Sequence, residues 1–257
     1  MKLALVQTDL VWENPTANLA NIEEQITALN QSVDLIVLPE LFTSGFSMNP
    51  ALVAEPMNLT TFKWMKLMAA QTGAVVTGSY AVKERGEFFN RLIWMQPNGT
   101  FDYYDKRHLF RMSGEDAAYS AGSRKIVQQI KGFKILPLIC YDLRFPVWSR
   151  NCNLEYDLLL YVANWPAARR NIWRTLLAAR AIENQSFAVG LNRIGIDGNG
   201  VAHSGDSTIV DYKGDVLYDA KATASVYVHE LHRDELGVFR QLFPAYLDAD
   251  DFTLAFS

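Results

Sequence analysis

The sequence has 257 residues, of which 49% are hydrophobic, and its formal net charge at pH 7 is −4. This length and composition allow a large buried core, and the absence of a basic stripe argues against a nucleic-acid partner. No apolar run approaches the roughly 18 residues of a membrane span, and the start MKLALVQTDL lacks the apolar core of a signal peptide. We therefore expect a cytoplasmic protein without a membrane partner, whose Cys140 and Cys152 are reduced thiols.

The predicted elements form αβ-like segments at both ends of the chain and hairpins in the middle. Residues 2–10 predict a strand, and Asn14-Pro15 predicts the start of a helix that continues to about residue 30. Further strands are expected over 34–40, 74–82, 88–96, 100–108, 134–142, 155–165, 186–195, 206–220 and 224–231, and further helices over 60–73 and 169–185.

Neither a flexible linker nor a repeat is visible, so residues 1–257 are expected to form a single domain. The order of elements favours an α/β fold with a mixed sheet, or with two sheets packed face to face and helices outside.

Three strand ends carry residues that could perform acyl transfer. Glu40 closes LIVLPE, Lys106 closes TFDYYDK and Cys140 closes KILPLIC, and ligands gather at the carboxyl ends of strands in open α/β sheets. A thiol could act as nucleophile, a carboxylate as general base, and an ammonium with the backbone N–H of Tyr141 as oxyanion stabiliser. Each residue alone also has a structural interpretation, because Cys140 could be a small buried hydrophobe, Glu40 a loop cap and Lys106 a solvated charge.

The combination resembles the nitrilase superfamily of carbon–nitrogen hydrolases along almost the whole chain. The segments that carry the resemblance are DLIVLPELFTSGF, YYDKRHLF, LICYDLRFP, RTLLAARAIENQSFAVGLNRIG and GVAHSGDSTIVDYKGDVL. The resemblance implies a Glu-Lys-Cys triad of Glu40, Lys106 and Cys140, a thioester intermediate, and neither a metal nor an organic cofactor. It also implies a four-layer α-β-β-α sandwich of two mixed sheets with helices outside, and a homodimer.

The family also uses a second glutamate in the loop after the lysine. Here HLFRMSGEDAAYSAG offers Glu115 at that place, and its neighbour Asp116 remains an alternative.

Within the family, PELFTSGFSM, KRHLFRM and CYDLRFPVWSRN are most similar to bacterial omega-amidases. Such enzymes hydrolyse the terminal amide of 2-oxoglutaramate or 2-oxosuccinamate, so the resemblance implies a cation for the distal carboxylate. Arg144 is the first candidate, because its guanidinium can bind a carboxylate bidentately, although it could instead pair with Asp142 or with a backbone carbonyl. Arg169 and Arg170 are reserves. The expected cavity walls, which could equally be core residues, are Trp165, Phe42 and Phe46.

Other constellations are less persuasive. His229, Glu230 and His232 could hold a metal on a helix, but their segment reads as a strand. HSGDS brings together residue types of a serine triad, yet adjacency in sequence does not provide the geometry. The alternatives to an omega-amidase are a family member acting on a carbamoyl amine, a nitrile or another aliphatic amide, and a non-catalytic protein that retains the fold.

Overall fold

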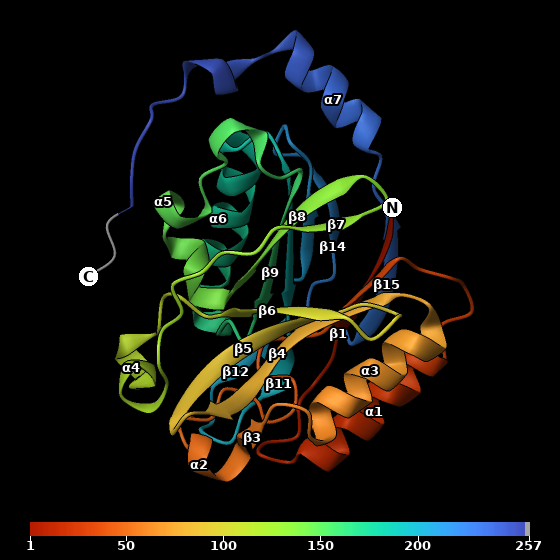
Figure 1. Ribbon diagram of the computed structural model, residues 1–257, viewed down its shortest axis with the longest axis vertical. Coiled ribbons are helices and arrows are strands. Elements are labelled where there is room, and N and C mark those ends of the chain that lie inside the picture. Colours follow the sequence, from red (N-terminus) through yellow and green to blue (C-terminus); the bar gives the residue numbers. More distant parts are fainter. Residues whose placement is uncertain (255–257) are drawn as a thin grey trace.

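The computed structural model describes residues 1–254, which form two β-sheets packed face to face between layers of helices (Figure 1). The α-helices are α1 (Pro15–Thr27), α2 (Pro50–Val53), α3 (Thr60–Thr72), α4 (Glu115–Ala118), α5 (Pro146–Ser149), α6 (Arg170–Glu183) and α7 (Arg233–Leu242). Within the described residues, no helix is both long and apolar enough to cross a membrane.

The first sheet has the strand order β15-β1-β2-β4-β5-β6, and β3 pairs with β4. Its strands are β1 (Lys2–Gln7), β2 (Leu35–Val37), β3 (Glu55–Pro56), β4 (Val75–Glu84), β5 (Glu87–Met95), β6 (Phe101–Asp105) and β15 (Ser225–Glu230). The pairs β1–β2, β2–β4 and β3–β4 are parallel, whereas β1–β15, β4–β5 and β5–β6 are antiparallel, so the sheet is mixed.

The second sheet has the order β14-β13-β10-β9-β8-β7 and is also mixed. Its strands are β7 (Gln128–Ile130), β8 (Phe133–Ile139), β9 (Leu158–Ala163), β10 (Phe187–Asn192), β13 (Thr208–Val210) and β14 (Val216–Asp219). A separate hairpin consists of β11 (Ile194–Ile196) and β12 (Ala202–Ser204).

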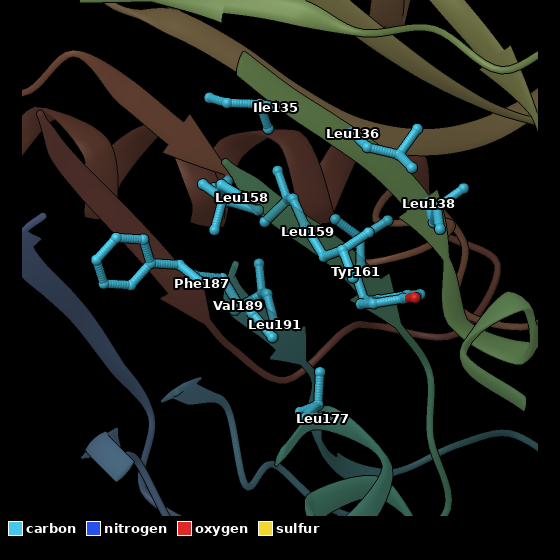
Figure 2. Close-up of a cluster of buried hydrophobic side chains, with 14 of the residues drawn as sticks. Ile135, Leu136, Leu138, Leu158, Leu159, Tyr161, Leu177, Phe187, Val189 and Leu191 are labelled. Atoms are coloured by element: carbon cyan, nitrogen blue, oxygen red, sulfur yellow. The ribbon is translucent and has the colours of Figure 1, made fainter. Parts of the chain in front are cut away.

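Alternating side chains create the four layers. In β1, Leu3 and Leu5 belong to the core between the sheets, whereas Ala4 and Val6 face the helical side with α1 and α3. The parallel strands β8 and β9 are apolar on both faces, as expected for strands covered on both sides. Figure 2 shows their side chains beside those of β10, with Leu177 contributed by α6. The predicted α/β sandwich of two mixed sheets is confirmed.

Several boundaries confirm local sequence signals. The Asn14 side chain accepts a hydrogen bond from the Ala17 N–H at the start of α1, and Gly73 ends α3 with φ 68°. Gly78 of β4 allows close packing, because a β-carbon there would lie 2.6 Å from Cβ of Leu38. This approach brings the segment that carries Glu40 against the sheet.

Other boundaries differ from the predictions. The strands expected to reach residues 40 and 142 end at Val37 and Ile139, so Glu40 and Cys140 both lie in turns beyond strand ends. The strand expected over 186–195 is divided after Asn192 into β10 and β11, and the Asn192 side chain accepts from the Trp165 N–H at this break. Helix α7 was not predicted.

Candidate active site

The ammonium of Lys106 lies between two buried carboxylates. Lys106 follows β6, and its Nζ donates to Oε1 of Glu40 at 2.7 Å and to both carboxylate oxygens of Glu115 at 2.9 Å. All three side chains are fully buried. Burial by itself disfavours the charged ammonium, but the carboxylates of Glu115 and Glu40 outweigh it and raise the pKa of Lys106. The arrangement therefore maintains a fixed positive charge in a buried site.

Cys140 occupies a sharp turn directly after β8. It begins the 3₁₀ turn η2 (Cys140–Arg144) with φ 44°, a left-handed conformation that costs a non-glycine residue about 1–3 kcal/mol. Burial is the largest cause of the raised pKa of the Cys140 thiol, and the negative charge of Glu40 raises it further, while Lys106 opposes the change. The thiol therefore keeps its proton at neutral pH, and the Glu40 carboxylate that interacts with it is chemically able to accept that proton.

The carboxylate of Glu40 is oriented by two asparagines that the sequence analysis did not identify. The Asn164 backbone N–H donates to Oε2 at 2.8 Å, and Asn90 Nδ2 donates to Oε1 at 2.9 Å. The Asn164 side chain also donates to the backbone carbonyl of Glu40. Asn90 had a signal in the sequence, because it is a polar residue inside an apolar strand. Asn164 also had one, because it directly follows the apolar run of β9, but its contact with Glu40, 124 residues away, could not be predicted from the sequence.

A third buried carboxylate, Asp142, joins the turn that begins at Cys140 to the segment around Lys106. Its Oδ2 accepts from Ile139 N at 3.0 Å and from Tyr104 Oη at 2.7 Å, and its Oδ1 accepts from His108 N at 3.0 Å. The His108 ring nitrogen Nδ1 lies 2.8 Å from the same Oδ1. Because Tyr104 and His108 lie on either side of Lys106 in the chain, this network fixes the spacing between the thiol and the ammonium.

The structure distinguishes the two candidates for the second acid. Glu115 begins α4, is fully buried and also accepts from Phe110 N at 2.6 Å. Its pKa is raised by burial, an effect that the charge of Lys106 opposes. Asp116 instead pairs with Arg111 on the surface. Of these two candidates, Glu115 is therefore the one that contacts Lys106.

A cavity of about 940 Å³ opens onto Cys140. Arg144, Arg169, Trp165, Tyr141 and Phe46 are among its lining residues. The Arg144 guanidinium lies 5.3 Å from the Trp165 ring centre, and neither it nor Arg169 forms an ion pair with another residue of 1–254. These two cations therefore retain the capacity to bind an anionic ligand.

The prediction for Phe42 as a cavity wall is wrong. Its side chain is fully buried in the core beside α3, where its ring lies 5.9 Å from Trp64, and it is absent from the cavity lining. The reason is the turn after Glu40, which directs Phe42 toward the sheet and Phe46 toward Lys106, 5.1 Å from its Nζ.

The remaining candidates lie elsewhere. Arg170 donates to Asp206 at 2.7 Å and does not line the cavity, so Arg169 is the reserve that remains. Cys152 lies in a separate short turn, and His229 and Glu230 lie in β15, as the strand interpretation predicted. Within residues 1–254, no three His, Cys, Asp or Glu side chains are grouped closely enough to bind a metal ion.

The chain is similar to known proteins along almost its whole length. The family model described as carbon-nitrogen hydrolase matches residues 2–241. Omega-amidase YafV of Escherichia coli K12 is 45% identical over 255 residues, covering 99% of this chain and 98% of that protein. The 2-oxoglutaramate amidase of Bacillus subtilis is 32% identical, with 96% of each chain covered.

Among solved structures, a CN-hydrolase superfamily protein from Xanthomonas campestris, described with an arsenic adduct in its active site, is 42% identical. It has a TM-score of 0.96 and covers 99% of both chains. Nit3 of Saccharomyces cerevisiae, described as a member of branch 10 of the nitrilase superfamily, has a TM-score of 0.84 at 24% identity, and it supports the fold alone.

Proposed function

Since the chain belongs to the carbon–nitrogen hydrolase family, we propose that it is an omega-amidase that hydrolyses a short dicarboxylate monoamide. 2-Oxoglutaramate and 2-oxosuccinamate are the substrates of choice, and the products are the 2-oxo acid and ammonia. The observation that carries the proposal is the buried Glu40–Lys106–Glu115 cluster beside Cys140, which opens onto a cavity lined by two arginines that form no ion pair with residues 1–254.

The reaction begins when Cys140 Sγ attacks the amide carbon while Glu40 accepts the thiol proton. Lys106 and the Tyr141 backbone N–H stabilise the oxyanion. When the C–N bond breaks, Glu40 returns the proton to nitrogen, ammonia leaves, and a thioester remains on Sγ. Water, deprotonated by the same carboxylate, then attacks the thioester, releases the acid and restores the thiol. Glu115 contributes by holding the ammonium of Lys106 in place.

The preference for a distal carboxylate is assigned to Arg144. It lies in the same turn as Cys140, lines the cavity and has no ion-pair partner among residues 1–254. A charge-assisted hydrogen bond is worth about 1.5–3 kcal/mol, which corresponds to roughly 10- to 100-fold in kcat/KM.

The test measures ammonia release from 2-oxoglutaramate and from an uncharged amide of equal length. Wild type should prefer 2-oxoglutaramate, Arg144→Gln should lose most of that preference, and Arg85→Gln in the exposed β4–β5 turn is the control. A preference that persists in Arg144→Gln but falls in Arg169→Gln would transfer the role to Arg169. Turnover of a carbamoyl amine or nitrile in place of 2-oxoglutaramate would contradict the proposal.

We further propose that residues 1–257 act as one domain and assemble as a cytoplasmic homodimer. The two sheets share a common apolar core, which supports one folding unit. Exposed apolar side chains near the C-terminus, including Leu242, Phe243 and Leu247, support burial against a second copy. Light scattering of the purified protein measures the mass, and a monomer at micromolar concentration would contradict the dimer.

A further inference from the structure

The cavity has two walls of different chemistry. The first, here called the arginine wall, contains Phe110, Tyr141, Arg144, Trp165 and Arg169. Ring contacts connect its members, since Phe110 lies 5.0 Å from Tyr141 and the Arg169 guanidinium lies 5.2 Å from Phe110. Its guanidinium groups can only donate hydrogen bonds, so this wall suits an anionic group.

The second, here called the hairpin wall, contains Trp12, Glu13, Asp197, Asn199 and His203. Asp197 and Asn199 lie in the turn between β11 and β12, and His203 lies in β12, so one hairpin supplies all three to the cavity lining. Contact with the β1–α1 loop is close, because a β-carbon on Gly198 would lie 2.4 Å from the Trp12 ring. The hairpin and the loop therefore form one continuous surface.

The hairpin wall is rich in hydrogen-bond acceptors. Glu13 accepts from Ser47 through Oε1 at 2.6 Å, and its carboxylate has no ion-pair partner within residues 1–254. His203 is only 6% exposed, and its Nδ1 has no hydrogen-bond partner in the described structure. Burial, and then the charge of Arg193, lower the pKa of His203, so the imidazole is neutral at pH 7.

The positive charge of Arg193 acts on Asp197 and His203 from outside the cavity. Its side chain is buried, pairs with Asp9 and is not part of the cavity lining. Asp197 uses Oδ1 to accept from the N–H groups of Asn199 and Val201, which leaves its charge at the wall. The wall therefore offers anionic and neutral acceptors to a donor-rich ligand.

The cavity also exceeds the proposed substrate in size. Cavities of roughly 300–1,000 Å³ hold drug-sized ligands, and this one measures about 940 Å³. A C5 monoamide whose nitrogen departs as ammonia occupies only part of that space. Its distal carboxylate would bind at the arginine wall. The hairpin wall remains available to a substituent on the amide nitrogen.

We propose that the hairpin wall is a subsite for a cationic amine leaving group, so that the enzyme also hydrolyses N-substituted monoamides whose amine carries an ammonium. The inference rests on the proposed function and extends its substrate class. Cys140 Sγ bonds to the acyl carbon, the C–N bond breaks, and the amine departs with the proton that Glu40 took from the thiol. Water then releases the same 2-oxo acid.

The experiment compares release of 2-oxoglutarate from three substrates of one acyl group. They are 2-oxoglutaramate, its N-(2-aminoethyl) derivative and its N-propyl derivative. The N-propyl group matches the N-(2-aminoethyl) group in size but carries no ammonium. Wild type should prefer aminoethyl to propyl by about tenfold in kcat/KM, as expected for one charge-assisted hydrogen bond. Glu13→Gln should bring this ratio close to one, and His203→Phe, which retains an aromatic ring, should reduce it.

Glu24→Gln is the matched control, because it makes the same charge change on the exposed side of α1 and should leave the ratio unchanged. Equal rates for aminoethyl and propyl in wild type, or hydrolysis of 2-oxoglutaramate alone, would overturn the subsite and leave the proposed function standing. A ratio unchanged in both Glu13→Gln and His203→Phe would overturn the assignment to this wall. Failure on all three substrates would overturn the proposed function and this inference together.

Discussion

Replacement of Asp142 by Asn should damage both stability and turnover, although the two side chains have nearly the same shape. One carboxylate oxygen faces the backbone N–H of His108, and the other faces the backbone N–H of Ile139. An amide provides only one oxygen, so its NH₂ group opposes a buried backbone donor in either orientation.

The size of the effect follows from that mismatch. A buried donor left without an acceptor costs about 1–3 kcal/mol, and in a chain of this size 1 kcal/mol lowers Tm by about 2–4 °C. Asp142→Asn should therefore lose roughly 2–12 °C in Tm. Because Asp142 sets the spacing between Cys140 and Lys106, a displacement of about 1 Å should also lower kcat/KM by about 10²-fold.

Thermal unfolding and steady-state kinetics on 2-oxoglutaramate, the latter well below Tm, measure the two effects separately. Asp211→Asn is the control, because Asp211 accepts both of its turn hydrogen bonds through Oδ1 and an amide oxygen can replace it. Wild-type Tm and kcat/KM in Asp142→Asn would refute the reasoning. A lower Tm with full turnover would refute only the positioning role.

The remaining predictions concern the reacting groups. Cys140→Ala should abolish turnover and the covalent acyl adduct detected by mass spectrometry, whereas Cys152→Ser should keep most activity; equal inactivation would contradict the assignment of the nucleophile. Glu40→Gln should lower kcat by about 10²–10⁴-fold and Lys106→Met by about 10²–10³-fold, and full activity in either variant would disprove the mechanism. EDTA should leave the rate unchanged, because none of these steps uses a metal. Because the pKa of Cys140 is raised, the thiol stays protonated at pH values above the ordinary thiol pKa of about 8.5. The pH profile of kcat/KM should therefore show no rise near pH 8.5, and a rise there would indicate a free, exposed thiol.

Local chemistry in the sequence determined most elements of this fold. Asn14-Pro15 and Gly73 define helix ends through hydrogen bonds and φ values that need few distant residues. The apolar runs before Glu40 and Cys140 predict strands buried on both faces, and those strands are present in shortened form. The sequence also placed Glu40, Lys106 and Cys140 just after strands, which is a property of each segment by itself.

Only the tertiary structure decided which side chains meet. Lys106 and Glu40 are 66 residues apart, and Asn164 and Glu40 are 124 apart, so their contacts depend on the order of strands in two different sheets. The turn after Glu40 sends Phe42 into the core and Phe46 into the cavity, a choice that depends on the space above Gly78. Likewise, Arg169 and Arg170 were equally good candidates for substrate binding in the sequence, and only the structure shows that Arg170 is paired with Asp206. Such choices cannot be read from a segment, because burial and pairing are properties of the surroundings that the rest of the chain supplies.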